Sequence, residues 1–319
     1  MGESYAGIYI PYFTQAILAN PDKLKINLKS ITIGDGTFGN AAAATDVVMT
    51  TYLHEQNSIL NIPADLLAAY DQGDEKCGFT KVLQQGLAYP PAGKIQIPGN
   101  PEGENYRLKK RQLGHCVLLP DTPALVNESI SLCNGGCATW TTALDYLSVT
   151  QSCFSAYNVK YNCANYPDGP DTSDFVAYLS LPTVRQAIHA PDKFYADCNQ
   201  TVYNPLVLEQ VEPPAYSIIP AILEAGIEAH FYSGDDDLFL NHFGTELSIQ
   251  NMTWCGLQGL QKKPDNAQKI AAKLELDCKL GIFVKGKHQS NARTGASIQQ
   301  RAVCEPSIQS SRLYASRGY

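Results

Sequence analysis

Ten cysteines constrain the folding of this 319-residue chain more than any other feature of its sequence. Six of them fall between Cys77 and Cys163. An even number of cysteines clustered in a loop-rich stretch predicts disulfide bonds, with several pairings open. The alternative is a zinc site at Cys133 and Cys137, but no second close pair with histidine follows at zinc-finger spacing. We therefore expect disulfide bonds and no metal site.

Three acceptor sequences for N-linked glycans indicate the same oxidising compartment as the cysteines. They begin at Asn127, Asn199 and Asn251. Because disulfide bonds and these glycans both form along the secretory route, we expect a protein that is secreted or that resides in a vacuole or lysosome. The residues that follow Met1 do not resemble a signal peptide. The cysteine count is therefore typical of a secreted protein, whereas the start of this sequence is not.

Composition excludes several classes of protein. Hydrophobic residues make up 44% of the chain and charged residues 17%, which is typical of a globular protein rather than of a disordered one. The net charge of −7 argues against nucleic acid as a partner. No run of 18 apolar residues occurs, so no membrane span is predicted.

Helical and strand patterns alternate along the chain, and hairpin signals are few. The segments with helical spacing of apolar residues are 8–19, 45–71, 173–189 (two short helices) and 215–226. The strand patterns are 26–33, which Gly34-Asp35-Gly36 ends with a turn, and 227–232. Such an alternation predicts an α/β protein with a largely parallel sheet.

Two segments differ from this alternation. Residues 86–137 contain Pro90-Pro91 and several glycines, which predicts a loop-rich, cross-linked insertion. Residues 285–319 carry six basic side chains and one acidic side chain, Glu305. One interpretation of this basic segment is a solvated tail. The other is that it does not belong to the fold that precedes it.

The hexapeptide Gly2-Glu3-Ser4-Tyr5-Ala6-Gly7 carries the clearest chemical signal of the chain. A nucleophile elbow is a strained turn from a strand into a helix, and it needs small residues around the serine that it projects. Gly2 and Gly7 flank Ser4 in this way, although Ala6 stands where the general pattern has glycine. The alternative interpretation is an ordinary tight turn.

Followed by Ile-Tyr-Ile-Pro, this hexapeptide resembles the active-site segment of the serine carboxypeptidase family (peptidase family S10). Asp35 stands where that family usually has asparagine. Further segments resemble the family in the same order, so that the similarity covers residues 1–264. These segments are 26–36, 178–189, 231–244 and 251–259.

The resemblance implies an α/β-hydrolase fold without its N-terminal strands and with a disulfide-rich helical and loop insertion at about residues 45–210. Residues 265–319 would then be an atypical basic C-terminal segment. In this interpretation the sequence is an incomplete or wrongly joined gene product, and Met1 is an internal residue of the natural protein.

The resemblance also assigns catalytic and binding roles. Ser4 matches the nucleophile, and Asp237 matches the acid that orients the catalytic base. The alternative for Asp237 and its two neighbouring aspartates is a solvated acidic turn or a fortuitous cation site. The backbone N–H of Tyr5 would be one oxyanion donor, whereas the second belongs to an upstream glycine-rich loop that this chain lacks. Glu3 matches an acidic residue that helps to bind the C-terminal carboxylate of the substrate.

The catalytic base is the role for which no residue matches well. The family places this histidine in a Gly-x-Gly-His segment after the acid, and no such segment occurs here. His288 follows the acid at a tolerable distance but lacks the flanking pattern. His189 and His230 lie in a predicted helix and a predicted strand, so we expect them to be structural.

The implied function is hydrolysis of the C-terminal peptide bond of peptides and proteins through an acyl-enzyme on Ser4, without a metal or organic cofactor. One alternative is acyl transfer to an alcohol by the same acyl-enzyme. Another is a catalytically dead, secreted binding protein, because neither the base nor the second oxyanion donor is found in the chain.

Overall fold

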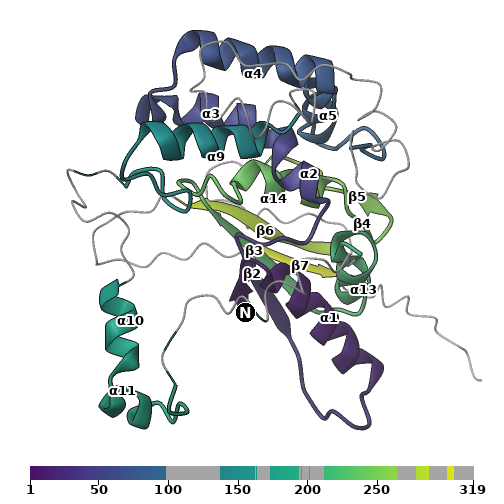
Figure 1. Ribbon diagram of the computed structural model, residues 1–319. Helices are drawn as coiled ribbons and strands as arrows, with labels where there is room; N and C mark the ends of the chain where they lie inside the picture. The colour runs from purple at the N-terminus through teal and green to yellow at the C-terminus, as the bar shows by residue number, and fades with distance from the viewer. Residues whose placement is uncertain are drawn as a thin grey trace, which may run out of the picture.

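The computed structural model describes residues 1–97, 137–161, 163, 173–193, 195, 201, 212–263, 278–286 and 300–304. A five-stranded sheet with the strand order β1-β2-β3-β6-β7 forms its centre (Figure 1). The first four strands in this order run parallel, and β7 pairs antiparallel with β6. This confirms the predicted α/β class with a largely parallel sheet. The strands are β1 (Gly2–Glu3), β2 (Ser30–Gly34), β3 (Glu228–Gly234), β6 (Cys278–Gly286) and β7 (Gln300–Cys304).

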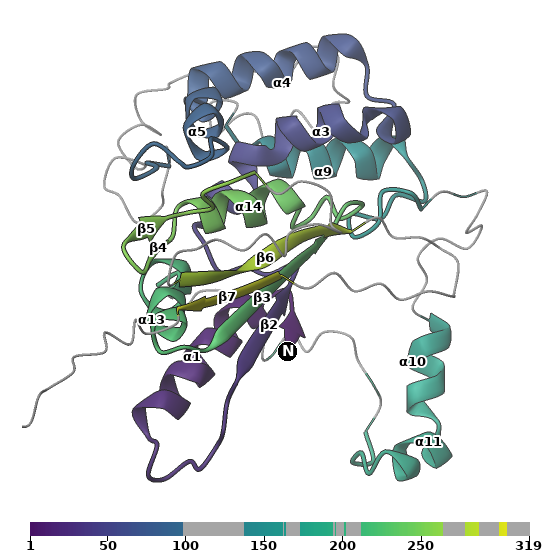
Figure 2. The same cartoon turned by 180° about the vertical axis from the view of Figure 1, so that it is seen from behind.

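Helices cover both faces of this sheet (Figures 1 and 2). The helix α1 (Ala6–Ala19), the short 3-10 helix η1 (Pro214–Tyr216) and the helix α13 (Ile218–Glu224) pack on one face. The helix α14 (His242–Gln250) packs on the other face, next to α2 (Ala41–Ala44). A small antiparallel pair, β4 (Thr253–Trp254) and β5 (Leu257–Gln258), follows α14.

A second helical layer lies beyond α14 in both views (Figures 1 and 2). Its long helices share an apolar core in which Tyr52, Leu53 and Leu147 are fully buried. The members of this layer are α3 (Asp46–Leu60), α4 (Ala64–Cys77), α5 (Phe79–Gly86) and α9 (Thr139–Thr150). Two further helices, α10 (Ser173–Ser180) and α11 (Pro182–Ala187), lie away from the sheet.

The central strand β3 alternates half-buried and buried residues along its whole length. Ala229 and Phe231 point into the core on the α13 side, where Ile219 and Ile222 pack. This period of two is the pattern that predicts a strand with one face in the core. The strand prediction for 227–232 is therefore confirmed, with β3 ending two residues later at Gly234.

The helical pattern over 45–71 is confirmed, and it belongs to two helices: Asn61 adopts a left-handed conformation (φ 51°) and Pro63 precedes α4, so that α3 and α4 are separate. One boundary prediction was wrong. The strand predicted over 26–33 begins only at Ser30. Its partner β3 begins opposite Ser30 at Glu228, and a strand needs a paired neighbour. The two short helices predicted within 173–189 are confirmed as α10 and α11.

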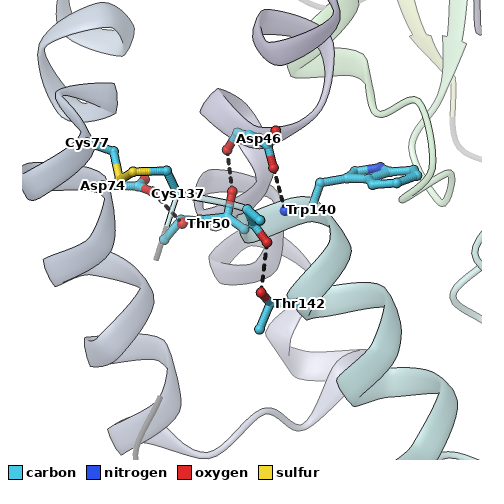
Figure 3. The surroundings of a disulfide bond; sticks show 9 residues. Asp46, Thr50, Asp74, Cys77, Cys137, Trp140 and Thr142 are labelled. Carbon is cyan, nitrogen blue, oxygen red and sulfur yellow. Dashed lines mark hydrogen bonds between the residues drawn. A yellow bond between two sulfur atoms is a disulfide. The ribbon is translucent and has the colours of Figure 1, made fainter. Parts of the chain in front are cut away.

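Disulfide bonds cross-link the helical layer, as the cysteine count predicts. Cys77 at the end of α4 is bonded to Cys137, two residues before α9 (Figure 3). Cys153 is bonded to Cys163. Cys255 is also disulfide-bonded. Since Cys137 is held in a disulfide, it is not available to the zinc site considered as an alternative. The other five cysteines lie outside the residues whose side chains the structure describes.

The loop-rich segment predicted over 86–137 is described only at its two ends. Residues 87–97 contain no helix or strand, in agreement with the loop prediction, whereas 98–136 lie outside the described residues. In the described part of the chain, no helix combines the length and hydrophobicity needed to cross a bilayer. The division of the chain at residue 264 stays a prediction.

Candidate active site

Ser4 lies at the turn from β1 into α1, where a nucleophile elbow would place it. Its φ is +61°, a left-handed conformation that is uncommon for a residue with a side chain and that often marks a functional site. Its N–H donates to the Gly34 carbonyl oxygen at 2.9 Å, and its carbonyl oxygen accepts from the Thr37 N–H at 3.1 Å. The turn is therefore fixed to β2 and to the residues after it, while Ser4 stays exposed.

Glycines let this turn pack closely. A Cβ on Gly7 would lie 2.6 Å from the Thr37 carbonyl oxygen, and one on Gly2 would lie 2.7 Å from Cβ of Ala6. Both distances are too short for a carbon contact, so the two positions around Ser4 accept only glycine without movement of the main chain. This confirms that the hexapeptide forms a strained, tightly packed turn at a strand-to-helix junction.

Asp237 follows β3 on a buried turn. It is 9% exposed, and its Oδ1 accepts a hydrogen bond from the Leu240 N–H at 3.1 Å. Its neighbours Asp235 and Asp236 are also buried, and Asp236 Oδ2 lies 2.8 Å from Lys160 Nζ. The alternative of a solvated acidic turn is therefore wrong.

Register places the ends of three strands side by side. Glu3 of β1 pairs with Gly34 of β2, and Gly34 pairs with Tyr232 of β3. The residues that follow these strands therefore lie along one edge of the sheet. In open α/β sheets, functional groups gather at the carboxyl ends of the parallel strands. Ser4 after β1 and Asp237 after β3 lie on this edge, with Asp35 of the intervening turn between them.

Three carboxyl groups at this edge influence one another. The pKa of Asp237 is raised to about 7, mainly by burial. The negative charges of Asp35 and Glu3 act in the same direction, and main-chain hydrogen bonds from Leu240 and Phe239 act against it. Burial likewise raises the pKa of Asp35, and the Glu3 charge acts in the same direction. Glu3 and Asp237, two site residues predicted from the sequence, thus lie at the same edge of the sheet. Asp35, which was given no role from the sequence, lies there with them.

Two residues with cross-strand roles, Asp35 and Tyr232, were not assigned any function from the sequence. Asp35 Oδ1 accepts hydrogen bonds from Ser233 Oγ at 2.9 Å and from the Gly234 N–H at 2.8 Å. Tyr232 Oη donates to Glu3 Oε2 at 3.3 Å. The one sequence signal was the aspartate at position 35, where the resemblance leads one to expect asparagine.

Three of the four described histidines lie beside carboxyl groups other than Asp237. His242, at the start of α14, is 2% exposed, and its Nε2 lies 3.3 Å from Glu55 Oε2. His189 is exposed at the end of α11. His288 lies outside the described residues. The other described histidines are His54, 2.8 Å from Asp71, and His230, 3.5 Å from Glu228.

The remaining predicted site residues are placed as follows. Tyr5 is the N-cap residue of α1 and follows Ser4 directly, so its N–H lies at the positive end of that helix. Asn251 is the C-cap residue of α14, and its Oδ1 accepts from the Ile95 N–H at 3.1 Å. Asn127 and Asn199 lie outside the described residues. In the described part, no group of three or more His, Cys, Asp or Glu side chains converges as a metal site.

A strained serine between a parallel strand and a helix, with an aspartate beyond the next strand but one, defines a hydrolase-type α/β arrangement. The model of the serine carboxypeptidase family matches residues 1–283, so the chain belongs to that family. It is 39% identical over 280 residues to a carboxypeptidase Y homologue of Arthroderma benhamiae, a match that covers 82% of this chain and 54% of the relative.

Two other similar proteins bear names of carboxypeptidases. A pheromone-processing carboxypeptidase KEX1 of Puccinia graminis is 28% identical over 266 residues, which is 81% of this chain and 34% of the relative. The crystal structure of a prohormone-processing carboxypeptidase, Kex1, from Saccharomyces cerevisiae aligns with a TM-score of 0.52 and 20% identity, over 87% of this chain and 53% of that chain. This likeness supports the α/β-hydrolase fold. The chain spans about half the length of the curated carboxypeptidase relatives from Arthroderma benhamiae that it matches.

Proposed function

We propose that this chain supplies the nucleophile and the triad acid of a serine-type carboxypeptidase that acts on the C-termini of peptides and proteins. The observation that carries the proposal is Ser4 at φ +61° between β1 and α1, in a family whose model matches residues 1–283. Such a turn exposes the hydroxyl and places it at a helix N-terminus, where negative charge is stabilised.

In the proposed reaction, Ser4 Oγ attacks the carbonyl carbon of the last peptide bond. The serine proton passes to a histidine base and then to the departing amino group as the C–N bond breaks. The Tyr5 N–H donates to the oxyanion that forms during attack. Water then hydrolyses the acyl ester and restores the Ser4 hydroxyl. His288 stays a candidate for the base.

The two acidic residues have separate roles in this proposal. Asp237, held by the Leu240 N–H, orients the histidine and stabilises its protonated form. Glu3 binds the carboxyl group of the substrate from the turn beside Ser4. Acting on a free C-terminus requires such a group, because the carboxylate must be recognised next to the bond that is cleaved.

A fluorophosphonate probe and a peptide with a free C-terminus test the proposal on protein from the natural host. We expect covalent labelling at Ser4 and release of the C-terminal amino acid. Ser4→Ala should abolish labelling and lower the rate by a factor on the order of 10⁴ or more. Ser58→Ala, on the exposed side of α3, is the matched control and should leave both unchanged.

Two outcomes would contradict the proposal. An active Ser4 that transfers an acyl group from an activated ester to an alcohol, without releasing amino acids, would make the protein an acyltransferase. A folded, glycosylated protein without labelling would be a binding protein instead.

We also infer a place in the secretory route, as a secreted or vacuolar protein. The Cys77–Cys137 and Cys153–Cys163 disulfides support this inference, since such bonds persist in oxidising compartments. Glycans at Asn127, Asn199 and Asn251 are part of the same proposal, and digestion with an N-glycosidase followed by mass measurement tests them.

A further inference from the structure

The ring of Tyr232 lies across Gly34 and reaches the turn that carries the nucleophile. Tyr232 is the register partner of Gly34, which in turn is the partner of Glu3. A Cβ on Gly34 would overlap the tyrosine ring, so the ring occupies space that only a glycine leaves open. Tyr232 Oη then donates to Glu3 Oε2 at 3.3 Å.

This arrangement restricts a side chain that would otherwise be mobile. Glu3 is exposed, and a free glutamate side chain loses rotamer entropy when it is held in one orientation on binding. Tyrosine has only two side-chain torsions, and Tyr232 is carried by the central strand of the sheet. A rigid donor can therefore fix the carboxyl group before a ligand arrives, which is the usual benefit of preorganisation.

The hydrogen bond from Tyr232 also gives the two oxygens of the Glu3 carboxyl group different roles. Oε2 accepts from the phenol, so in the protonated form of Glu3 the proton is expected on Oε1. That oxygen can then donate to a carboxylate on the ligand. Asp35 keeps β3 in place for this purpose, since its Oδ1 accepts from Ser233 and Gly234 directly after Tyr232.

We propose that Tyr232 is a positioning residue that holds the Glu3 carboxyl group in the orientation that binds the free C-terminal carboxyl group of a peptide. The inference rests on the proposed function of Ser4 and Glu3. It adds a residue on β3 that sets the preference for a free C-terminus over a blocked one.

The test compares a peptide acid with the corresponding peptide amide in protein from the natural host. Wild-type protein should bind the acid more tightly, and Tyr232→Phe should reduce this preference about tenfold, the value of one hydrogen bond to a charged or polar group. The KM for a peptide acid should rise while kcat and the rate of fluorophosphonate labelling at Ser4 change less than about twofold.

Two further variants separate positioning from a general structural role. Tyr12→Phe removes a phenolic hydrogen bond to the Glu212 carbonyl oxygen and should leave the preference intact. In a Glu3→Gln background, Tyr232→Phe should have little further effect, because both substitutions act on one contact.

The outcomes distinguish this inference from the function on which it rests. Wild-type protein in which Ser4 is labelled, but in which Tyr232→Phe leaves the preference for the acid unchanged, would overturn the positioning role alone. Wild-type protein without labelling at Ser4 and without any preference for the acid would overturn both.

Discussion

At the scale of single residues, Asp35 influences the candidate site both through its hydrogen bonds and through its charge. Its carboxyl group holds Ser233 and Gly234, and its charge raises the pKa of Asp237. In the proposed triad, Asp237 must be ionised to orient a histidine, so its raised pKa is expected to move the acidic limit of activity to higher pH.

Replacing Asp35 with asparagine separates these two effects. The amide oxygen can still accept from Ser233 and Gly234, but the charge is gone, so the pKa of Asp237 should fall. We expect the acidic limb of the pH profile of Ser4 labelling to move to lower pH by on the order of one unit. Asp22→Asn, on the exposed loop after α1, is the control and should not move the limb. An unchanged limb in Asp35→Asn would show that the two carboxyl groups are not coupled.

At the scale of elements, α3 and α4 enclose acidic side chains beside the Cys77–Cys137 disulfide (Figure 3). Asp74 is 5% exposed and accepts from Thr50 Oγ1 at 2.9 Å. Burial raises its pKa to about 7, with Asp71 and Asp46 acting in the same direction and Thr50 and His54 against it. Burial also raises the pKa of Asp46 to about 6, although the Trp140 N–H donates to it.

These raised pKa values predict a helical layer that is most stable at acidic pH. Below about pH 4, Asp74 is protonated in both the folded and the unfolded chain, so it has no effect on stability. Between about pH 4 and 7 the unfolded chain ionises first, and folding becomes less favourable by about 1.4 kcal/mol per pH unit, or at most about 4 kcal/mol. Above pH 7 the cost stays constant.

Urea unfolding of wild-type protein and Asp74→Asn at pH 4.5 and 7.5 measures this cost. The asparagine can still accept from Thr50, so the variant should lose much less stability at pH 7.5 than the wild type does. Glu75→Gln, on the exposed side of the same helix, should keep the wild-type difference between the two pH values. Equal losses in all three proteins would mean that the pKa of Asp74 is the same in the folded and the unfolded chain.

At the scale of the whole molecule, the sheet and the helices α1 and α13 share one core that positions the site. Phe231 of β3 is 4% exposed and lies 4.8 Å from the Phe38 ring, centroid to centroid. The core residues Ile219 and Ile222 of α13 pack in the same cluster. This core supports the strand ends on which Ser4 and Asp237 are carried.

Phe231→Ala should therefore lower the free energy of unfolding by about 3–5 kcal/mol. Phe13→Ala removes the same side chain from α1, where it is 66% exposed, and should cost less than about 0.5 kcal/mol. Chemical unfolding of both variants checks the difference. Similar costs for the two would indicate that Phe13 is covered by another part of the molecule.

Much of the fold followed from local patterns. The alternating burial of β3, the short helices within 173–189 and the turn at Gly34-Asp35-Gly36 depend on residues close in the chain, and these predictions hold. The boundary between α3 and α4 was missed because the apolar spacing continues across Asn61 and Pro63. The strand was predicted to begin at residue 26, but β2 begins at Ser30, because its pairing with Glu228, far away in the chain, decides where it starts.

The sequence by itself determined the family, the position of Ser4 and the position of Asp237, since short motifs with glycine at fixed spacing require a particular turn. Only the tertiary structure decided that Tyr232 reaches Glu3 and that Asp35 holds Ser233. These contacts join residues 229 and 198 positions apart. They arise from the register of three parallel strands, and no local pattern encodes that register, because each strand contributes only one member of every pair.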